Sequence, residues 1–149
     1  MRARDMNEEY PIIDLDADAL SAAQLIVERR LPGVVVTDAK GKPQSVLRSW
    51  QVVQFIVPGY VQDDPQLAGV LSEMSADRLC ARLSGKTVRS LLPRDAEELP
   101  CVDADDTIIE VAAMMARLRC PLVAVMDGDR LIGVVTASRL LQFALGLQQ

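Results

Sequence analysis

An internal repeat is the feature that most constrains how this 149-residue chain can fold. Residues 19–56 and 108–145 carry the same order of apolar, proline and acidic positions, at a spacing of 89 residues that becomes 88 after a turn where the first copy holds one extra residue. Because chance rarely matches so many positions in one order, each copy is expected to form one structural unit that packs against the other. The matched positions include Pro32 with Pro121, Asp38 with Asp127, and Phe55 with Phe143.

A helix followed by a hairpin is predicted in each copy. In the second copy Thr107 and Glu110 form a capping box, which predicts that a helix begins there, and Pro121 ends it. The runs 122–126 and 131–136 are rich in β-branched residues and are joined by the turn sequence DGD, so they are expected to pair as a β-hairpin.

A short strand before the first helix and a second helix after the hairpin complete each unit. The strands are expected at 11–15 and 99–103, and the last helix of the second copy at 137–145. The fold class is therefore α/β (α+β), with two β-α-β-β-α repeats packed about a pseudo-twofold axis, because so small a sheet cannot bury both faces alone. A sheet core shared by both copies is expected from Val34, Val36, Val46, Leu47, Val123, Val125, Val134 and Val135.

Four segments follow from the repeat. Residues 1–9 are expected to be a polar N-terminal tail, 10–57 the first repeat, and 96–149 the second repeat. Residues 58–95 show helical spacing after a proline, so we expect a helical connector rather than a flexible linker.

Charge and composition exclude several functional classes. The net charge is −5 and no basic stripe is present, so nucleic-acid binding is not expected. No secretory signal and no apolar run near 18 residues is found, which predicts a cytoplasmic protein without membrane insertion. The chain has no histidine and no closely spaced cysteine pair, so no metal site, no catalytic residues and no enzyme activity are expected. Cys80, Cys101 and Cys120 are expected to be reduced, buried thiols.

Taken together, these motifs resemble a tandem cystathionine-β-synthase (CBS) domain pair, a Bateman-type regulatory module. The resemblance rests on the two β-α-β-β-α copies, the proline before each VVVTD or VAVMD strand, and the sequence GVVTASRL at 133–140. It implies adenosine-containing ligands bound in the cleft between the repeats, and a regulatory role.

The ligand motif of this family is only partly present. Ligand-binding members carry glycine, two apolar residues, threonine or serine, two variable residues and an aspartate that grips the ribose. The second copy keeps Gly133 and Thr136 but has Arg139 in place of the aspartate. The first copy has Ser45, Arg48 and Gln51 at these positions. A guanidinium only donates hydrogen bonds, whereas the Gln51 amide oxygen could accept one, so the acid is missing from both sites.

Each candidate ligand residue also has a structural interpretation. Thr136 is well placed as a helix N-cap, and Arg139 in a first helical turn calls for an anion or a surface ion pair. The resemblance adds further cleft residues, which are Pro32, Cys120, Pro121 and Leu122.

Two functions remain open. The first is a stand-alone regulatory module that senses AMP, ADP, ATP, a related adenosyl compound or another phosphorylated small molecule, and modulates a partner such as an enzyme or transporter. The alternative is a CBS pair that has lost ligand binding and acts as a dimeric protein-interaction module. In either case a homodimer without a bound cofactor is expected. If a nucleotide binds, its phosphates should supply the affinity, and Arg139→Ala should weaken it.

Overall fold

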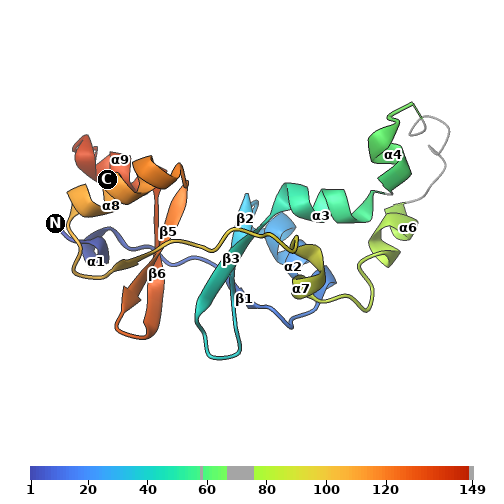
Figure 1. Cartoon of the computed structure of the whole chain (residues 1–149), viewed down its shortest axis with the longest axis horizontal. Helices are drawn as coiled ribbons and strands as arrows, with labels where there is room; N and C mark the ends of the chain where they lie inside the picture. The colour runs from blue at the N-terminus through green and yellow to red at the C-terminus, as the bar shows by residue number, and fades with distance from the viewer. Residues whose placement is uncertain (58, 67–75, 148–149) are drawn as a thin grey trace.

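The computed structural model describes residues 1–57, 59–66 and 76–147. Two lobes lie side by side along the long axis of the molecule, one for each repeat (Figure 1). Each lobe holds a three-stranded sheet with helices packed beside it, and the N-terminus lies at the lobe of the second repeat. The expected α/β fold with two repeats is confirmed.

The two lobes have the same element order. The first lobe contains β1 (Ile12–Asp14), α2 (Ala19–Glu28), β2 (Gly33–Thr37), β3 (Pro43–Arg48) and α3 (Ser49–Ile56). The second contains β4 (Cys101–Asp103), α8 (Ile108–Leu118), β5 (Leu122–Asp127), β6 (Arg130–Thr136) and α9 (Ala137–Ala144). In each sheet the first strand runs parallel to the second, and the second pairs antiparallel with the third. Each copy is therefore the predicted β-α-β-β-α unit.

Local backbone details repeat as well. A residue with left-handed backbone follows the first helix of each unit, Arg30 with φ 51° and Arg119 with φ 52°. The carbonyl oxygens of Pro32 and Pro121 accept hydrogen bonds from the first residue of α3 and of α9, at 2.9 Å and 2.8 Å. The repeat seen in the sequence thus extends to the hydrogen bonds that join each hairpin to its second helix.

The connector contributes three short helices to the described part of the chain. They are α4 (Gly59–Asp63), α6 (Ala76–Ala81) and α7 (Val88–Leu91). Residue 58 and residues 67–75 of the predicted connector lie outside the described residues. Val88 and Leu91 of α7 are buried in the core of the first lobe, so the last turn of the connector packs as part of that lobe.

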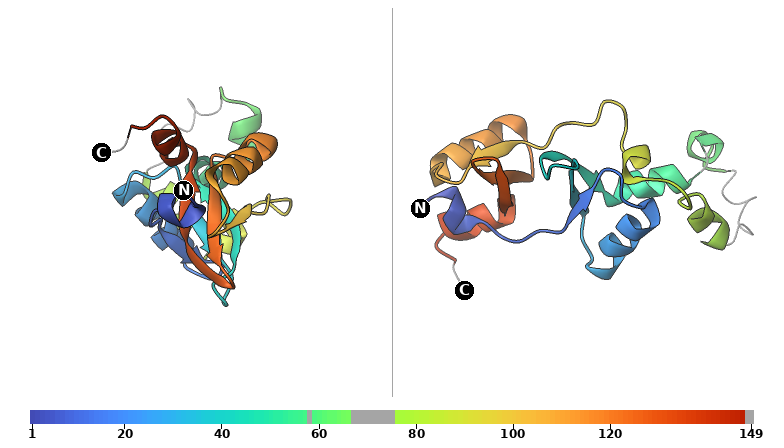
Figure 2. Two further views of the ribbon diagram at one scale, coloured as in Figure 1. Left: turned by 90° about the vertical axis from the view of Figure 1, so that its left-hand side faces the viewer. Right: turned by 90° about the horizontal axis from the view of Figure 1, so that it is seen from below.

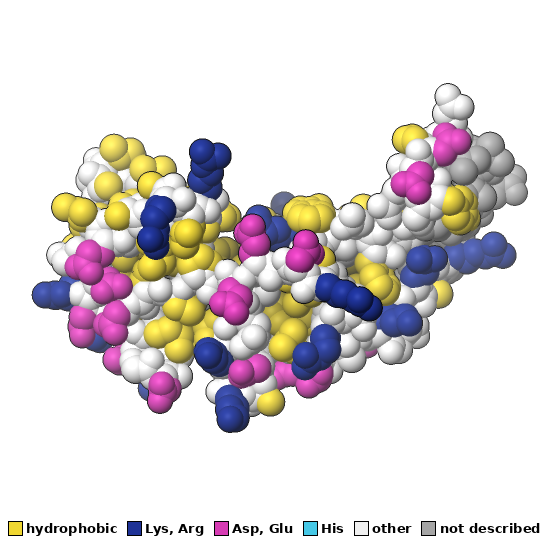
Figure 3. All heavy atoms as spheres, viewed as in Figure 1, with side chains coloured by type: hydrophobic (Ala, Val, Ile, Leu, Met, Phe, Trp, Pro, Cys, Tyr) yellow, Lys and Arg dark blue, Asp and Glu magenta, His cyan; other side chains and the backbone are white. Residues whose placement is uncertain are grey.

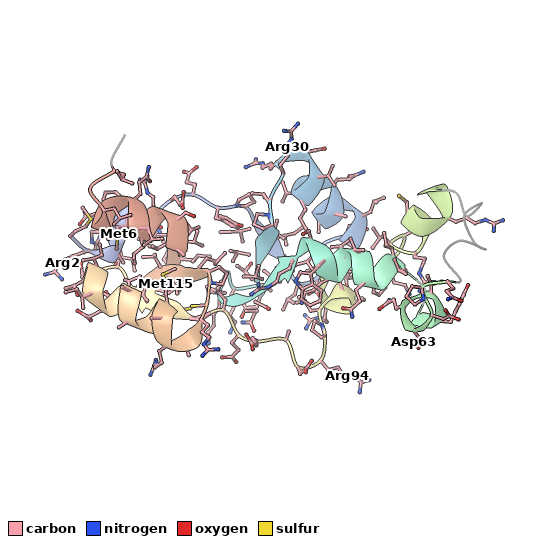
Figure 4. The ribbon with its side chains drawn as sticks, turned by 90° about the horizontal axis from the view of Figure 1, so that it is seen from above. Arg2, Met6, Arg30, Asp63, Arg94 and Met115 are labelled. Carbon is pink, nitrogen blue, oxygen red and sulfur yellow. The ribbon has the colours of Figure 1, made fainter. Side chains whose placement is uncertain are left out.

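The N-terminal segment packs against the second lobe instead of forming a polar tail. Ala3 and Met6, both on α1 (Ala3–Met6), are fully buried, and the Ala3 N–H donates to the carbonyl of Asp106 at 2.8 Å. Residues three apart lie on the same face of a helix, so even one turn can present an apolar face despite its charged neighbours. Figure 4 shows Met6 in the same lobe as Met115 of α8, and both belong to one hydrophobic cluster.

Three hydrophobic clusters replace the single shared core that the sequence predicted. Val34, Val36 and Leu47 pack within the first lobe, whereas Val123, Val125 and Val135 pack within the second. A third cluster fills the space between the two sheets and contains Val35, Leu99, Leu122, Ala124 and Val134, with Val46 beside it. Successive side chains of a strand point to opposite faces of its sheet. One face therefore packs in the core of its own lobe, and the other packs in the cluster between the two sheets.

Within the described residues the chain crosses between the lobes twice. One crossing follows α1 and the other leads from α7 to β4, and both are visible in Figure 2. Tyr10 and Leu99, which are 89 residues apart, occupy equivalent positions in the crossings and pack in the cluster between the sheets. Each crossing also bonds to a hairpin, because Glu8 pairs with Val134 and the Leu99 N–H donates to the Gln44 carbonyl at 3.1 Å.

The three cysteines form no disulfide, as expected, but they are less buried than predicted. Cys80 and Cys101 are exposed and Cys120 is half-buried. Cys101 lies on a strand whose exposed and buried positions alternate, so its side chain points away from the core that holds Val102.

Candidate functional site

Thr136 stands at the junction between β6 and α9. Its Oγ1 accepts a hydrogen bond from the Arg139 main-chain N–H at 3.1 Å, so the threonine is the N-cap of α9 as the sequence predicts. On the neighbouring strand Leu122 is its register partner. The β5–β6 pairing therefore fixes where this hydroxyl lies.

Glu8 supplies a carboxylate to this junction. The Thr136 hydroxyl donates a hydrogen bond to Glu8 Oε1 at 2.8 Å. Main-chain hydrogen bonds between Glu8 and Val134, at 2.9 Å and 3.1 Å, hold the N-terminal segment along the edge of β6. The motif itself has Arg139 where the aspartate would stand, but Glu8 brings a carboxylate to Thr136 from another segment of the chain. The expectation that this site lacks an acid is therefore wrong.

Glu8 also acts electrostatically on Tyr10. The pKa of the Tyr10 hydroxyl is raised first by partial burial and then by the negative charge of Glu8. The N-terminal segment thus brings a charged carboxylate next to the cluster between the sheets.

Gly133 is needed for the approach of this N-terminal segment. A Cβ atom at this position would lie 2.6 Å from the Glu8 carbonyl oxygen and would also overlap the Asn7 side chain. With glycine at this position the Asn7 side chain lies against the strand, where its amide donates a hydrogen bond to the Ile132 carbonyl at 3.2 Å. At the equivalent position of the first lobe Ser45 is accommodated, and its hydroxyl donates to the Glu97 carbonyl at 3.0 Å. In this chain the glycine of the motif is therefore explained by the close approach of the N-terminal segment.

Arg139 turns along α9. Its guanidinium lies over the Phe143 ring at 4.9 Å, and its Nη1 donates to Gln142 Oε1 at 3.3 Å. The Nε atom is buried and has no hydrogen-bond partner. The sequence favoured a surface ion pair, but the two ion pairs within the described residues join Arg4 to Asp105 and Arg89 to Asp16. Arg139 is thus stabilised by a cation–π contact instead.

A surface pocket of about 620 Å³ opens beside Thr136. The polar and charged residues Glu8, Thr136 and Arg139 line it, together with leucines from α9 and from the residues after it. The full lining is Glu8, Thr136, Ser138, Arg139, Leu141, Gln142, Leu145 and Leu147. An apolar surface with a few convergent polar groups is the common form of a small-molecule site.

The predicted site residues of the first lobe lie apart from this pocket. Pro32 borders the β3–α3 junction, where Arg48 is exposed and Gln51 is buried. The Gln51 side-chain oxygen, which the sequence offered as an acceptor for ribose, accepts a hydrogen bond from the Arg48 main-chain N–H at 2.8 Å. Gln51 is therefore engaged in capping α3.

Cys120 and Pro121 line a second, largely apolar pocket of about 560 Å³. It lies between α8 and α9, and Met115 and Leu140 also line it. Partial burial raises the pKa of the Cys120 thiol. Three predicted cleft residues lie in this lobe. Leu122 pairs with Thr136, whereas Cys120 and Pro121 line the pocket between α8 and α9.

Sequence reasoning missed Glu8 because the residue lies in a segment expected to be a tail. The repeat held a usable signal, since Glu8 and Glu97 are 89 residues apart, the same spacing as Pro32 and Pro121. Extending the alignment toward the N-terminus would have placed both acids next to their hairpins. Their outcomes differ, because Glu8 bonds to Thr136 whereas Glu97 is exposed near Ser45.

No group of three or more His, Cys, Asp or Glu side chains in the described residues is arranged to hold a metal ion. None of the helices in the described ranges has the length and apolar character needed to cross a membrane.

Comparison with known proteins identifies relatives along the whole chain. A family model described as CBS domain matches residues 88–146. A search of curated proteins found no match. The crystal structure of a CBS domain-containing protein of unknown function from Kribbella flavida DSM 17836 is 54% identical, with a TM-score of 0.94 and coverage of 97% of this chain and 99% of that chain.

Two more distant structures share the fold and contain ligands. CBSX2 in complex with AMP is 17% identical, with a TM-score of 0.67 and coverage of 99% of this chain and 98% of that chain. The CBS domain pair of MJ0100, in complex with 5′-methylthioadenosine and S-adenosyl-L-methionine, is 17% identical, with a TM-score of 0.63 and the same coverage. The repeated β-α-β-β-α lobes, the family model and the identity to the Kribbella flavida protein together place this chain in the family of CBS domain proteins.

Proposed function

We propose that the protein is a regulatory module that binds an adenosyl-containing small molecule in the pocket beside Thr136. The observation that carries the proposal is the meeting of Thr136, Glu8 and Arg139 on one pocket with an apolar wall. CBS pairs of the same fold hold AMP in one case, and 5′-methylthioadenosine and S-adenosyl-L-methionine in another. Those complexes make an adenine nucleotide or a related adenosyl compound the ligand class to test.

The pocket offers separate surfaces for the parts of such a ligand. Leu141, Leu145 and Leu147 provide apolar surface for a base, and the Gln142 amide can bond to its polar edge. The polar end at Thr136 and Glu8 suits the sugar side. Because Glu8 belongs to the N-terminal segment and Thr136 to the hairpin, a ligand would bridge two segments and alter how firmly α1 is held.

A regulatory role follows from this arrangement. The proposed signal is a change in the packing of α1 and α9, which a partner enzyme or transporter in the cytoplasm would read. Cysteines without a disulfide partner support a reducing compartment. Catalysis is not part of the proposal.

Calorimetric titration with adenosine, AMP, ATP, 5′-methylthioadenosine and S-adenosyl-L-methionine tests the proposal. Thr136→Val should weaken binding at least tenfold, because it removes the hydroxyl that donates to Glu8 at 2.8 Å in the lining of the pocket. Thr107→Val is the matched control, since Thr107 caps α8 in the same lobe and lies outside the pocket. Equal loss of affinity in both variants, or no binding of any of these compounds to the unaltered protein, would overturn the proposal.

A dimeric interaction module is the second candidate function. Figure 3 shows hydrophobic side chains gathered over the lobe that carries α8 and α9. Ile109 and Leu141 are 77% and 53% exposed, and the apolar pocket between α8 and α9 lies on the same helices. Exposed apolar surface of this kind favours association with another protein surface.

A further inference from the structure

We infer that Glu8 sets the ligand choice of the pocket beside Thr136, in favour of adenosyl compounds without a phosphate and against nucleotides. The inference rests on the proposed function and names the ligand class within it. It reverses the expectation from sequence that phosphate supplies the affinity, because that expectation assumed that no carboxylate stands at the site.

The hydrogen-bond capacity of Thr136 is already in use. Its hydroxyl has one proton, which it donates to Glu8 Oε1 at 2.8 Å, and its oxygen already accepts from the Arg139 main-chain N–H. A phosphate oxygen only accepts, so it could bond to this hydroxyl only if the bond to Glu8 broke. In this structure the Glu8 carboxylate holds the place that a phosphate oxygen would take.

The negative charge of Glu8 also disfavours a phosphate at this site. Carboxylate and phosphate are both anions, and like charges a few ångströms apart at a partly buried site repel each other strongly. Glu8 is half-buried and takes part in neither ion pair of the described residues. Arg139 points its guanidinium toward Phe143 and Gln142. A phosphate at Thr136 would therefore meet the negative charge of Glu8, which no ion pair within the described residues offsets.

Main-chain hydrogen bonds fix Glu8 in place. Its main-chain N–H and carbonyl both bond to Val134, and the glycine at 133 lets the segment lie close against β6. Ala3 and Met6 anchor the preceding turn in the core of the lobe. Moving the carboxylate away would require detaching this segment, which makes displacement by an entering phosphate costly.

The same carboxylate suits the hydroxyl groups of a ribose. A carboxylate has about four acceptor positions, and Thr136 uses one of them. Two adjacent sugar hydroxyls can donate to those that remain, which is the role that the motif aspartate has in the family. Glu8 would then supply from the N-terminal segment the acceptor that Arg139 cannot.

Paired titrations with adenosine, 5′-methylthioadenosine and AMP test this inference. Glu8→Gln is the informative variant, because it keeps the size of the side chain and an oxygen that can accept from Thr136 while removing the charge. Glu9→Gln is the matched control, since Glu9 is the neighbouring exposed carboxylate and its loss changes the net charge equally. Circular dichroism and thermal melting establish that each variant is folded.

The unaltered protein and Glu9→Gln should bind adenosine and 5′-methylthioadenosine at least tenfold more tightly than AMP. In Glu8→Gln this preference should fall at least tenfold, because AMP gains affinity. A loss of stability alone would weaken all three ligands alike and leave the preference unchanged. Binding of AMP with an unchanged preference in Glu8→Gln would overturn this inference and leave the proposed function standing. Binding of none of the three would overturn this inference, and it would overturn the proposed function as well if ATP and S-adenosyl-L-methionine also fail to bind the unaltered protein.

Discussion

Val134 and Glu8 exchange both of their main-chain hydrogen bonds, at 2.9 Å and 3.1 Å, although they come from opposite ends of the sequence. The segment before the first repeat thus extends the sheet of the second repeat along the edge of β6. This pairing brings Glu8 to Thr136, and it makes the N-terminal residues part of the second lobe's core.

Met6→Ala should reduce the free energy of unfolding by about 2–5 kcal/mol, because Met6 is fully buried and its truncation leaves a cavity. Met1→Ala, at a position that is 53% exposed, is the control and should change it by less than about 0.5 kcal/mol. Urea unfolding followed by circular dichroism measures both. Equal stability of the two variants would show that α1 does not hold its place in the core.

Gly133→Ser should destabilise the protein by about 1–3 kcal/mol, since the new side chain would overlap the Glu8 carbonyl and Asn7. Gly59→Ser is the control, because no atom lies within 4 Å of the added Cβ. Thermal melting of the two variants should separate them clearly. A normal melting temperature for Gly133→Ser would mean that the N-terminal segment does not lie against β6 in solution.

Asp38→Asn should change the pH dependence of stability. The pKa of the Asp38 carboxyl lies below its ordinary value, chiefly because the Lys42 main-chain N–H donates to it, with a further bond from Lys40. A lowered pKa contributes stability that is complete above the unfolded-state pKa and is lost as the pH falls through the folded-state pKa.

Asp38→Asn should therefore be less stable than the unaltered protein at neutral pH, and the difference should shrink below about pH 4. Urea titrations between neutral and acidic pH measure this. Asp127→Asn at the equivalent hairpin position is the control, because the Asp127 carboxylate accepts no side-chain hydrogen bond within the described residues. A constant difference across the pH range would contradict the assignment to Asp38.

Leu141→Lys should weaken self-association at least tenfold if the face of α8 and α9 mediates it. Leu141 is 53% exposed and borders the apolar pocket on this face. Static light scattering at micromolar concentration should give a dimer mass for the unaltered protein and a lower mass for the variant. Val27→Lys, at an exposed position on α2 in the other lobe, should leave the mass unchanged. A monomer mass for the unaltered protein would contradict the expected homodimer.

Periodicity and capping in the sequence located most of the fold. The capping box of Thr107 and Glu110 begins α8, and the β-branched runs on both sides of the DGD turn form β5 and β6. These signals are local, because side-chain spacing and cap residues act within a few positions of each other. The repeat added the number of lobes and their common topology.

The arrangement around Thr136 could not be obtained in the same way. Its capping role is local and was predicted, whereas its bond to Glu8 depends on which sheet edge the N-terminal segment joins. The buried face of α1 is only one helical turn long. When hydropathy is averaged over a longer stretch of sequence, the charged neighbours of Ala3 and Met6 make the segment look polar. The orientation of the Arg139 guanidinium toward Phe143 likewise depends on which other side chains surround it in the folded protein.

The exchange of edge segments between the lobes has a consequence for the order of folding during synthesis. Residues 3–8 leave the ribosome before any of their partners on β4, α8 and β6 exist, so they must remain without those partners until β6 has been made. The first lobe waits less, because the Leu99 that bonds to Gln44 follows much sooner. During synthesis residues 3–8 should therefore become ordered later than the first lobe, although they are made before it.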